Sequence, residues 1–450
     1  MSGSSSNPIL SLLLDFNSYD YRPECLVIAK TLQPATSSPV KYLLNLSFCV
    51  RRPSALDSTA EHAIVVSHPI QALPPNHVLL KVERFGFSAN NITYEALGEH
   101  SHFRYFDFHA APPEFKTTHG LVPVWGFATV VASSHNKISV GERVYGYLAP
   151  CQYLLVPVSA SDVNRHAFYV PRPHLPPDRR PYNQITRCDS DPEYIPTEPA
   201  EDLTMLYRPL FWTAYWFEDW IHSVHYRGAT NVLISSASAK TAFCTAYLIR
   251  KRRTCGQTDA SLKIFGLTSQ RNIAFTRGLG LYDEVLEYAE LERGLGKGSD
   301  KWLYIDVAGN DKLNARLFKH FHDGELAGAV SLGMTSLAPA SKKVAKIDWQ
   351  TNTFSETNKE ALQMENFFMV EWLSVRKHQL SLHEIFSRQK RAWKELMTDC
   401  VSWVKLVRVS GPDAVKRVYD EVAKSGIPAD VGYVWSLWDE EQRTVLPGKL

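Results

Sequence analysis

The chain has no apolar run long enough to cross a bilayer. Its N-terminal apolar stretch, residues 9–14, is only six residues long, whereas a membrane helix needs about 20. No basic segment precedes it, so it does not look like a secretion signal. The formal net charge is only +2, which gives no electrostatic reason to bind nucleic acid or a membrane surface. We therefore expect a cytoplasmic protein that binds neither.

Cysteine pairs with the spacing C-x-x-C are also missing. The seven cysteines are an odd number and are widely spaced, at positions 25, 49, 151, 188, 244, 255 and 400. This usage is typical of a reducing compartment, and it argues against a disulfide scaffold or a structural zinc module.

The chain is long enough for two domains, because 450 residues with 44% hydrophobic content exceed one ordinary core. Short strand-like runs separated by turns lie within residues 77–158 and predict either a small barrel or a sandwich. From Thr204, strand-like and helix-like segments alternate, which predicts an α/β domain with a doubly wound parallel sheet. We expect domains at 1–205 and 206–370, followed by a C-terminal return, 371–450, into the first domain.

Two further segments are open to more than one interpretation. The proline-rich excursion 171–202 is either an ordered surface excursion or linker, or a lid over a site. Residues 366–372 resemble an edge strand, through which a homodimer can form.

The first turn between a strand and a helix in the parallel sheet lacks glycine. It reads SSASAKT at 235–241, so the G-x-G-x-x-G fingerprint is absent. Small residues still let a diphosphate approach the backbone, and the following helix start offers free N–H groups. The alternative is a turn that packs helix on strand and binds nothing. The candidate phosphate-binding residues are Ser236, Ala237, Ser238, Ala239, Lys240 and Thr241.

The segment at the end of the second strand, Thr268 to Asn272, also lacks an acidic residue. In NAD-binding proteins an acid at this place accepts a hydrogen bond from the 2′-hydroxyl of the ribose. Ser269 and Arg271 instead suit a 2′-phosphate, so the sequence predicts NADPH. The alternative is that Arg271 only decorates a solvated helix start. Thr268, Ser269, Arg271 and Asn272 complete this part of the candidate site.

Several phrases in the chain are distinctive. They are ANNITY at 89–94, VPVWGF at 122–127, RVYGY at 143–147, RPLF at 208–211, SSASAKT at 235–241 and GLTS at 266–269. On these residues the chain resembles the medium-chain dehydrogenase/reductase superfamily, and most closely a family within it whose function is uncharacterised. The resemblance implies a GroES-like β-barrel domain and a Rossmann dinucleotide-binding domain.

The resemblance also implies that no zinc is bound. Zinc-binding members carry a cysteine near Ser88 and Gly-His-Glu near residues 126–128, where this chain has Gly-Phe-Ala. It is similar instead to zinc-free quinone oxidoreductases and enoyl reductases. By that similarity, Tyr94, Asn91 and Thr213 are the candidate catalytic residues. The cofactor would also contact Tyr288, Ala308, Gly309, Leu332 and Gly333.

The function that this resemblance implies is hydride transfer from NADPH to a small-molecule α,β-unsaturated carbonyl or quinone. Tyr94 and Asn91 would stabilise the carbonyl oxygen, with Tyr94 as the proton donor. Tyr94 can equally be an ordinary buried tyrosine of a barrel strand, and Asn91 a turn former. Two other functions stay open: a non-redox relative that binds a nucleotide or metabolite, and a lyase or isomerase that uses the same cleft.

Overall fold

The computed structural model describes most of the chain after its N-terminal segment. The described residues are 44–56, 58–101, 103–176, 179–295, 300–321, 325–332, 347–348, 353–354, 364–367 and 369–443. They form two compact units. The first comprises residues up to Met205 with Leu406–Gly426 and the segment from Gly432, and the second comprises Leu206–Lys405 and Ile427–Val431.

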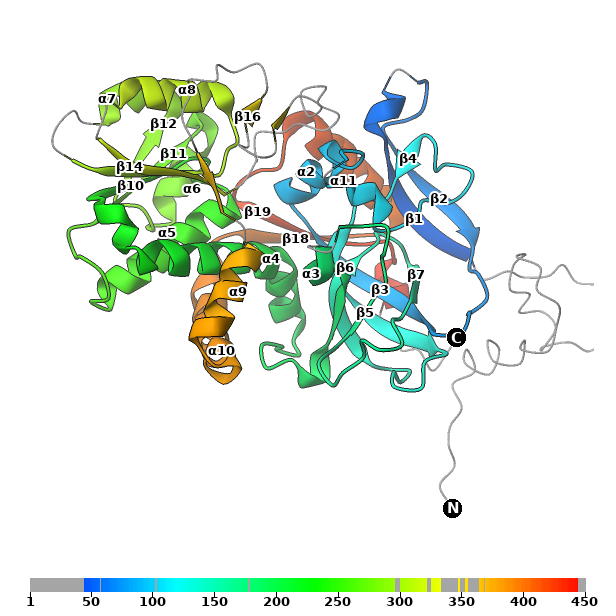
Figure 1. Ribbon diagram of the computed structural model, residues 1–450. Helices are drawn as coiled ribbons and strands as arrows, with labels where there is room; N and C mark the ends of the chain where they lie inside the picture. The colour runs from blue at the N-terminus through cyan, green and yellow to red at the C-terminus, as the bar shows by residue number, and fades with distance from the viewer. Residues whose placement is uncertain are drawn as a thin grey trace, which may run out of the picture. The chain divides into compact units, whose positions relative to one another are not determined.

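The first unit is built on antiparallel strands (Figure 1). A three-stranded sheet has the order β2-β1-β4, and a larger sheet has the order β18-β19-β3-β5-β6-β9-β8, with β7 also paired to β3. The strands are β1 (Leu44–Arg51), β2 (Ala63–Pro69), β3 (His77–Phe87), β4 (His119–Gly120), β5 (Val124–Ser133), β6 (Arg143–Leu148), β7 (Tyr153–Pro157), β8 (Ala167–Tyr169), β9 (Gln184–Arg187), β18 (Lys405–Ser410) and β19 (Val431–Ser436).

Among the described residues, four helices belong to the first unit: α2 (Ala89–Ala96), α3 (Arg180–Asn183), α11 (Pro412–Ser425) and α12 (Glu440–Arg443). A fifth, α4 (Glu198–Ser223), begins in this unit and continues into the second. The proline-rich excursion is not a simple linker, because its described part supplies β9, which pairs with β6 and β8. It also supplies α3 and the first residues of α4.

The second unit holds a six-stranded sheet with the order β12-β11-β10-β13-β14-β17. Every pair of neighbours in it is parallel. Numbered from β10, this is the order 3-2-1-4-5-6 of the dinucleotide-binding fold. The strands are β10 (Asn231–Ile234), β11 (Lys263–Thr268), β12 (Glu284–Glu287), β13 (Trp302–Asp306), β14 (Leu326–Ser331) and β17 (Glu365–Asn366), and a separate pair is β15 (Ile347–Asp348) with β16 (Thr353–Phe354).

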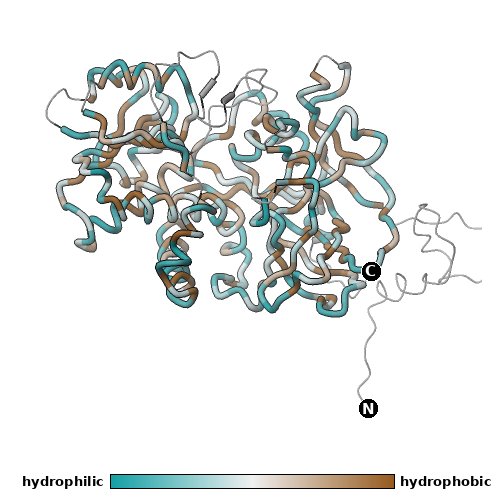
Figure 2. Tube along the Cα trace, viewed as in Figure 1, coloured by the Kyte–Doolittle hydropathy of each residue, from teal (hydrophilic) through white to brown (hydrophobic). Residues whose placement is uncertain are grey.

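Helices cover both faces of the parallel sheet, with α5 on one face and α8 on the other (Figure 1). The outer helix α8 alternates between hydrophobic and hydrophilic residues along its length (Figure 2), and buries Leu313 and Leu317. The helices are α5 (Lys240–Thr254), α6 (Ile273–Gly278), α7 (Leu291–Gly294), α8 (Asp311–His320), α9 (Met369–Gln379) and α10 (Leu382–Asp399).

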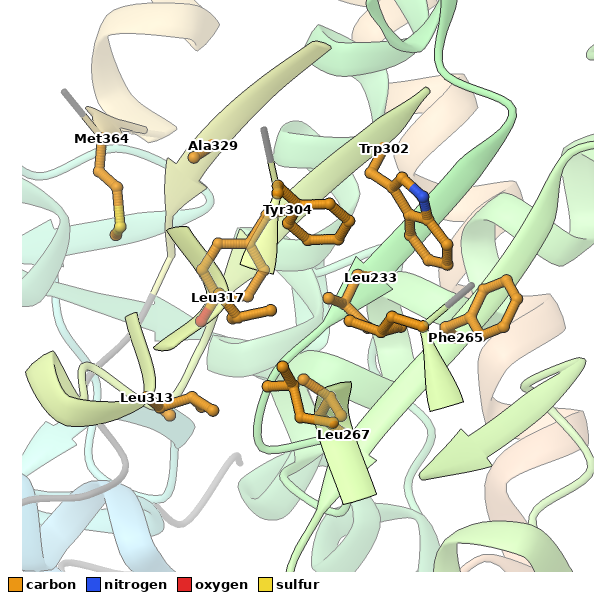
Figure 3. Packing of buried hydrophobic residues seen from close by; sticks show 13 residues of the cluster. Leu233, Phe265, Leu267, Trp302, Tyr304, Leu313, Leu317, Ala329 and Met364 are labelled. Carbon is orange, nitrogen blue, oxygen red and sulfur yellow. The ribbon is translucent and has the colours of Figure 1, made fainter. Parts of the chain in front are cut away.

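Side chains from the strands and from α8 meet in one buried core cluster (Figure 3). The rings of Phe265 and Trp302 lie 4.8 Å apart between centroids, beside Leu233 and Tyr304. Strands buried on both faces read as continuous apolar runs, which is why the sequence identified them. The predicted fold class, a GroES-like β-barrel domain plus a Rossmann domain, is confirmed.

The expected C-terminal return begins later than predicted. Residues 371–405 lie in the second unit, because α9 and α10 pack there. Arg376 and Trp372 both bond to Asp219 of α4, at 2.6 and 2.8 Å, and Trp393 is buried against Phe211. The expected edge strand 366–372 is wrong for the same reason: β17 ends at residue 366 and α9 begins at residue 369.

Candidate functional site

A pocket of about 350 Å³ lies in the second unit, lined by the turns that follow β10, β11, β12 and β13. In doubly wound sheets, ligands bind at the carboxyl edge where the strand order reverses, and β10 and β13 flank that point here. The lining residues are Ser236, Ser238, Thr268, Ser269, Arg271, Asn272, Tyr288, Ala308, Asn310, Lys312, Leu313 and Arg316. Eight of the fifteen predicted cofactor-binding residues are among them.

The glycine-free turn after β10 takes a glycine-like shape. Ser236 has φ of 50°, in the left-handed region that normally favours glycine. The Ser238 hydroxyl accepts hydrogen bonds from Thr268 Oγ1 at 3.3 Å and from Asn272 Nδ2 at 3.0 Å. These contacts join the first and second turns of the site, so the predicted residues of both turns lie together.

A glycine on the neighbouring strand makes room for this turn. Ala237 is fully buried, and its N–H donates to Leu267 O at 2.9 Å. A Cβ added to Gly266 would lie 2.8 Å from the Ala237 Cβ, closer than atoms can pack. Tyr282, whose hydroxyl donates to Ala237 O at 2.8 Å, closes the same space. The close approach that a motif glycine usually permits is therefore provided by Gly266.

Tyr288 already contacts the turn. The N–H of Ser236 donates to the phenol oxygen of Tyr288 at 3.0 Å, while the N–H of Ala239 donates to Ser236 O at 2.7 Å. Burial raises the pKa of Tyr288, so the phenol stays protonated at neutral pH. Ala239, the residue before α5, gives no side-chain cap to the first turn of that helix, so this residue does not take the place of an anion at the helix start.

A buried carboxylate organises the turn after β13. Asp306 is fully buried and accepts hydrogen bonds from Ser235 Oγ, Asn314 Nδ2 and the N–H groups of Ala308 and Gly309, at 2.8 to 3.0 Å. Burial raises its pKa. Every partner is a donor, so Asp306 fixes the shape of the turn and leaves no oxygen directed at a ligand.

The pocket is positively charged. Arg271, Lys312 and Arg316 line it, and none of the described residues that line it is acidic. Arg316 is paired with the carboxylate of Glu292, at 2.7 Å. Sequence reasoning missed Lys312 and Arg316, together with Asn310 and Leu313. The available signal was Asn310 as an N-cap followed by cations one helical turn apart on the same face.

The remaining predicted residues do not line the pocket. Lys240 points elsewhere: its ammonium lies 3.5 Å from Val431 O, and burial lowers its pKa to about 8. Its predicted contact with a phosphate stays a prediction. The turn and strand-end residues Ala237, Ala239, Thr241, Gly309 and Leu332 act through their backbones, and Gly333 lies outside the described residues.

The candidate catalytic residues of the first unit lie on a helix, not on a barrel strand. Tyr94 and Asn91 are in α2, which Ser88 caps. Asn91 Oδ1 accepts from the Ser88 N–H at 2.9 Å and its Nδ2 donates to Pro123 O at 3.1 Å, so Asn91 acts as a helix cap. Tyr94 is buried and accepts from Asn90 Nδ2 at 2.6 Å, a neighbour that sequence reasoning missed.

Thr213 lies on α4, and its hydroxyl donates to Pro209 O at 3.3 Å within the helix. It does not line the pocket, and its predicted contact with the nicotinamide stays a prediction.

The sequence matches a known family model over residues 85–428, described as a protein of unknown function (DUF2855). The chain belongs to this family. Among proteins of curated function, no sequence matches it. The family match runs from the end of β3 to beyond α11, and it includes the pocket and α2.

Two solved structures align with most of this chain and with nearly all of their own length. CurA from Vibrio vulnificus is 12% identical, with a TM-score of 0.50 over 87% of this chain and 98% of its own. Mycobacterial Rv1454c complexed with NADPH is 14% identical, with a TM-score of 0.50 over 87% and 99%. The chain therefore shares its fold with these two proteins.

The described residues show neither a metal cluster nor a membrane helix. Within those ranges, no group of three or more His, Cys, Asp or Glu side chains is arranged to hold a metal ion. None of the helices that the structure describes has both the length and the hydropathy that a membrane crossing requires.

Proposed function

We propose that this protein binds NADPH in the pocket beside β10, β11 and β13 and is a zinc-independent oxidoreductase for a conjugated carbonyl or quinone-like small molecule. The observation that carries the proposal is the pocket's combination of serine and threonine hydroxyls with Arg271, Lys312 and Arg316, without an acid among its described lining. Such a lining attracts an anion with several phosphates, and it contains no described carboxylate that would repel the phosphates.

The residues present fit a dinucleotide despite the missing glycines. Gly266 supplies the space that a glycine in the turn would have supplied, and Ser236 holds the left-handed conformation. Ser269 and Arg271, at the end of β11, would hold the 2′-phosphate. Ser236 and Ser238 would face the diphosphate, and Lys312 and Arg316 would neutralise charge from the opposite wall.

When bound, NADPH would supply a hydride to the substrate. The chain's own contribution is a proton donor for the carbonyl oxygen on which negative charge develops. Burial raises the pKa of Tyr94, so its phenol keeps its proton at neutral pH and can donate it. Asn90 orients that phenol. Asn91, engaged by Ser88 and Pro123, positions α2 and does not serve as a second donor.

A titration with NADPH and NADH, followed by nicotinamide fluorescence, tests the proposal. We expect saturable NADPH binding and weaker NADH binding. Arg271→Ala should weaken NADPH binding about tenfold, the value of one charge-assisted hydrogen bond, and leave NADH binding nearly unchanged. Arg293→Ala is the matched control, because Arg293 is exposed and pairs only with Glu290 in the described structure. Equal losses for both cofactors would contradict the 2′-phosphate assignment.

One observation favours the second candidate function, a non-redox relative that binds a nucleotide. The N–H groups of Ser236, Ala237 and Ala239 are all engaged within the protein, which leaves fewer donors for a diphosphate. Tyr288→Phe frees the Ser236 N–H. If Tyr288 blocks the diphosphate, NADPH affinity should rise in this variant. Lower affinity would instead show that the Tyr288 hydroxyl contributes to binding.

A further inference from the structure

An aromatic cluster surrounds Tyr94 in the first unit. It consists of Tyr94 on α2, Trp125 on β5, Tyr147 on β6 and Tyr182 on α3. The ring centroid of Tyr147 lies 5.6 Å from the ring centroid of Tyr94, 5.0 Å from that of Trp125 and 4.9 Å from that of Tyr182. Four elements thus bring their rings to one place, and three of these side chains are outside the predicted site.

Two buried donors of the aromatic cluster have no well-placed acceptor among the residues that the structure describes. Trp125 Nε1 and the Tyr147 hydroxyl are buried and make no hydrogen bond of normal geometry within the described residues. Burial raises the pKa of Tyr94, whereas the nearby donor groups of Trp125, Tyr147 and Asn90 lower it, so these groups surround the same phenol oxygen. An indole N–H can only donate. Buried donors without acceptors cost free energy, and each such group in a folded protein requires an explanation.

We propose that the aromatic cluster is a binding site for the carbonyl oxygen of a planar conjugated ligand, with Trp125 and Tyr147 as specificity-determining donors. Calling that ligand a substrate rests on the proposed function, but its binding does not require a cofactor. A carbonyl oxygen is an acceptor with two lone pairs, so it supplies what the cluster lacks. The surrounding ring faces match a flat π system.

A ligand would reach the aromatic cluster by displacing the side chain of Tyr182. Tyr182 and Trp125 are partly exposed, whereas Tyr94 and Tyr147 are buried. Tyr182 belongs to the proline-rich excursion. Within that segment Arg172 donates to Asn183 Oδ1, next to Tyr182, at 2.8 Å, and outside it Arg172 donates to Phe108 O at 3.0 Å. The ring of Tyr182 therefore covers the cluster from an anchored segment, and a planar ligand would replace that ring against Tyr147.

The test compares two ligands with the cofactor-free full chain by calorimetric titration. Coumarin is a planar conjugated carbonyl, and 2H-chromene has the same ring system without the carbonyl. We expect coumarin to bind more tightly than 2H-chromene. Tyr147→Phe should weaken coumarin binding about tenfold, the effect of one hydrogen bond to a buried donor, and leave 2H-chromene binding unchanged. Trp125→Phe also removes ring area, so it should weaken the binding of both ligands, and that of coumarin by about tenfold more. Tyr182→Ala should strengthen coumarin binding by removing the cover.

The folded state of each variant provides the control. Tyr147→Phe removes only an unsatisfied buried hydroxyl and should leave the melting temperature equal to or above that of the wild type, so loss of binding in this variant cannot be attributed to loss of fold. Tyr153→Phe changes a buried tyrosine outside the cluster and should alter nothing. The proposal is overturned if coumarin does not bind the wild type, or if both donor variants bind it as well as the wild type. Failure of NADPH to bind would remove the proposed function and leave coumarin binding at the aromatic cluster unaffected.

Discussion

The double variant Gly266→Ala/Ala237→Gly would test whether Gly266 on β11 takes the role of the glycine that the turn after β10 lacks. In Gly266→Ala, the new Cβ would lie 2.8 Å from the Ala237 Cβ and 3.0 and 3.1 Å from ring atoms of Tyr282. Overpacking of this kind costs about 2 kcal/mol. Ala237→Gly alone removes a buried methyl, about 0.8 kcal/mol, and loosens the backbone by about 0.7 kcal/mol.

If the two sites were independent, the double variant would lose about 3.5 kcal/mol, the sum of these effects. The structure predicts a loss of only about 2 kcal/mol, because the methyl added at position 266 would fill the space vacated at position 237, and only the contact with Tyr282 would remain. We therefore expect a coupling of about 1.5 kcal/mol.

Amide hydrogen exchange on β10 and β11 is the suitable assay, since a chain of two units need not unfold in one step. Peptides that contain Leu233 and Leu267 report the local free energy of opening. NADPH titration of the double variant would show whether the restored glycine keeps the site competent. The idea would be refuted if the stability loss of the double variant equals the sum of the two single losses to within about 0.5 kcal/mol.

Three other changes follow from the same unit. In Lys240→Met, we expect a gain of about 1 kcal/mol at pH 7. Burial lowers the pKa of Lys240 from 10.5 to about 8, so between these values the unfolded wild type holds the extra proton and wild-type stability rises with pH. Denaturation at pH 7 and 10.5 should show the gain disappearing at the higher pH. Asp306→Asn should cost about 2 kcal/mol, because the amide turns an N–H toward a donor; an unchanged melting temperature would contradict this. Ser236→Gly should stabilise by up to about 1 kcal/mol by relieving the positive φ, whereas Ser236→Ala should not.

The sequence was sufficient for the parts of the fold that depend on local apolar pattern. Strands β10 (Asn231–Ile234) and β13 (Trp302–Asp306) are nearly continuous hydrophobic runs, and they lie in the part of the chain where the sequence predicts the parallel sheet. It was insufficient where tertiary contacts decide the structure. Residues 369–372 look extended in isolation, but Trp372 is needed against Asp219, so the segment becomes helical.

The candidate site divides in the same way. Ser236, Ser238 and Arg271 were predictable because they follow strands directly, and the carboxyl ends of parallel strands meet at one edge. Lys312 and Gly266 were not, since their roles depend on which helix and which strand lie beside the turn. The direction of Lys240 was equally hidden, because a side chain at a helix start can face either way around the axis.

The discontinuous first unit has a consequence for biosynthesis. Strand β3 pairs with β5 and β7, which precede the second unit, and with β19 at residues 85–87, near the end of the chain. A nascent chain emerging from the ribosome therefore presents this edge unpaired until the residues of β19, 431–436, have been made. Unpaired edges recruit foreign strands, so a chaperone that shields Phe85 and Phe87 until β19 arrives would protect the most vulnerable stage of folding.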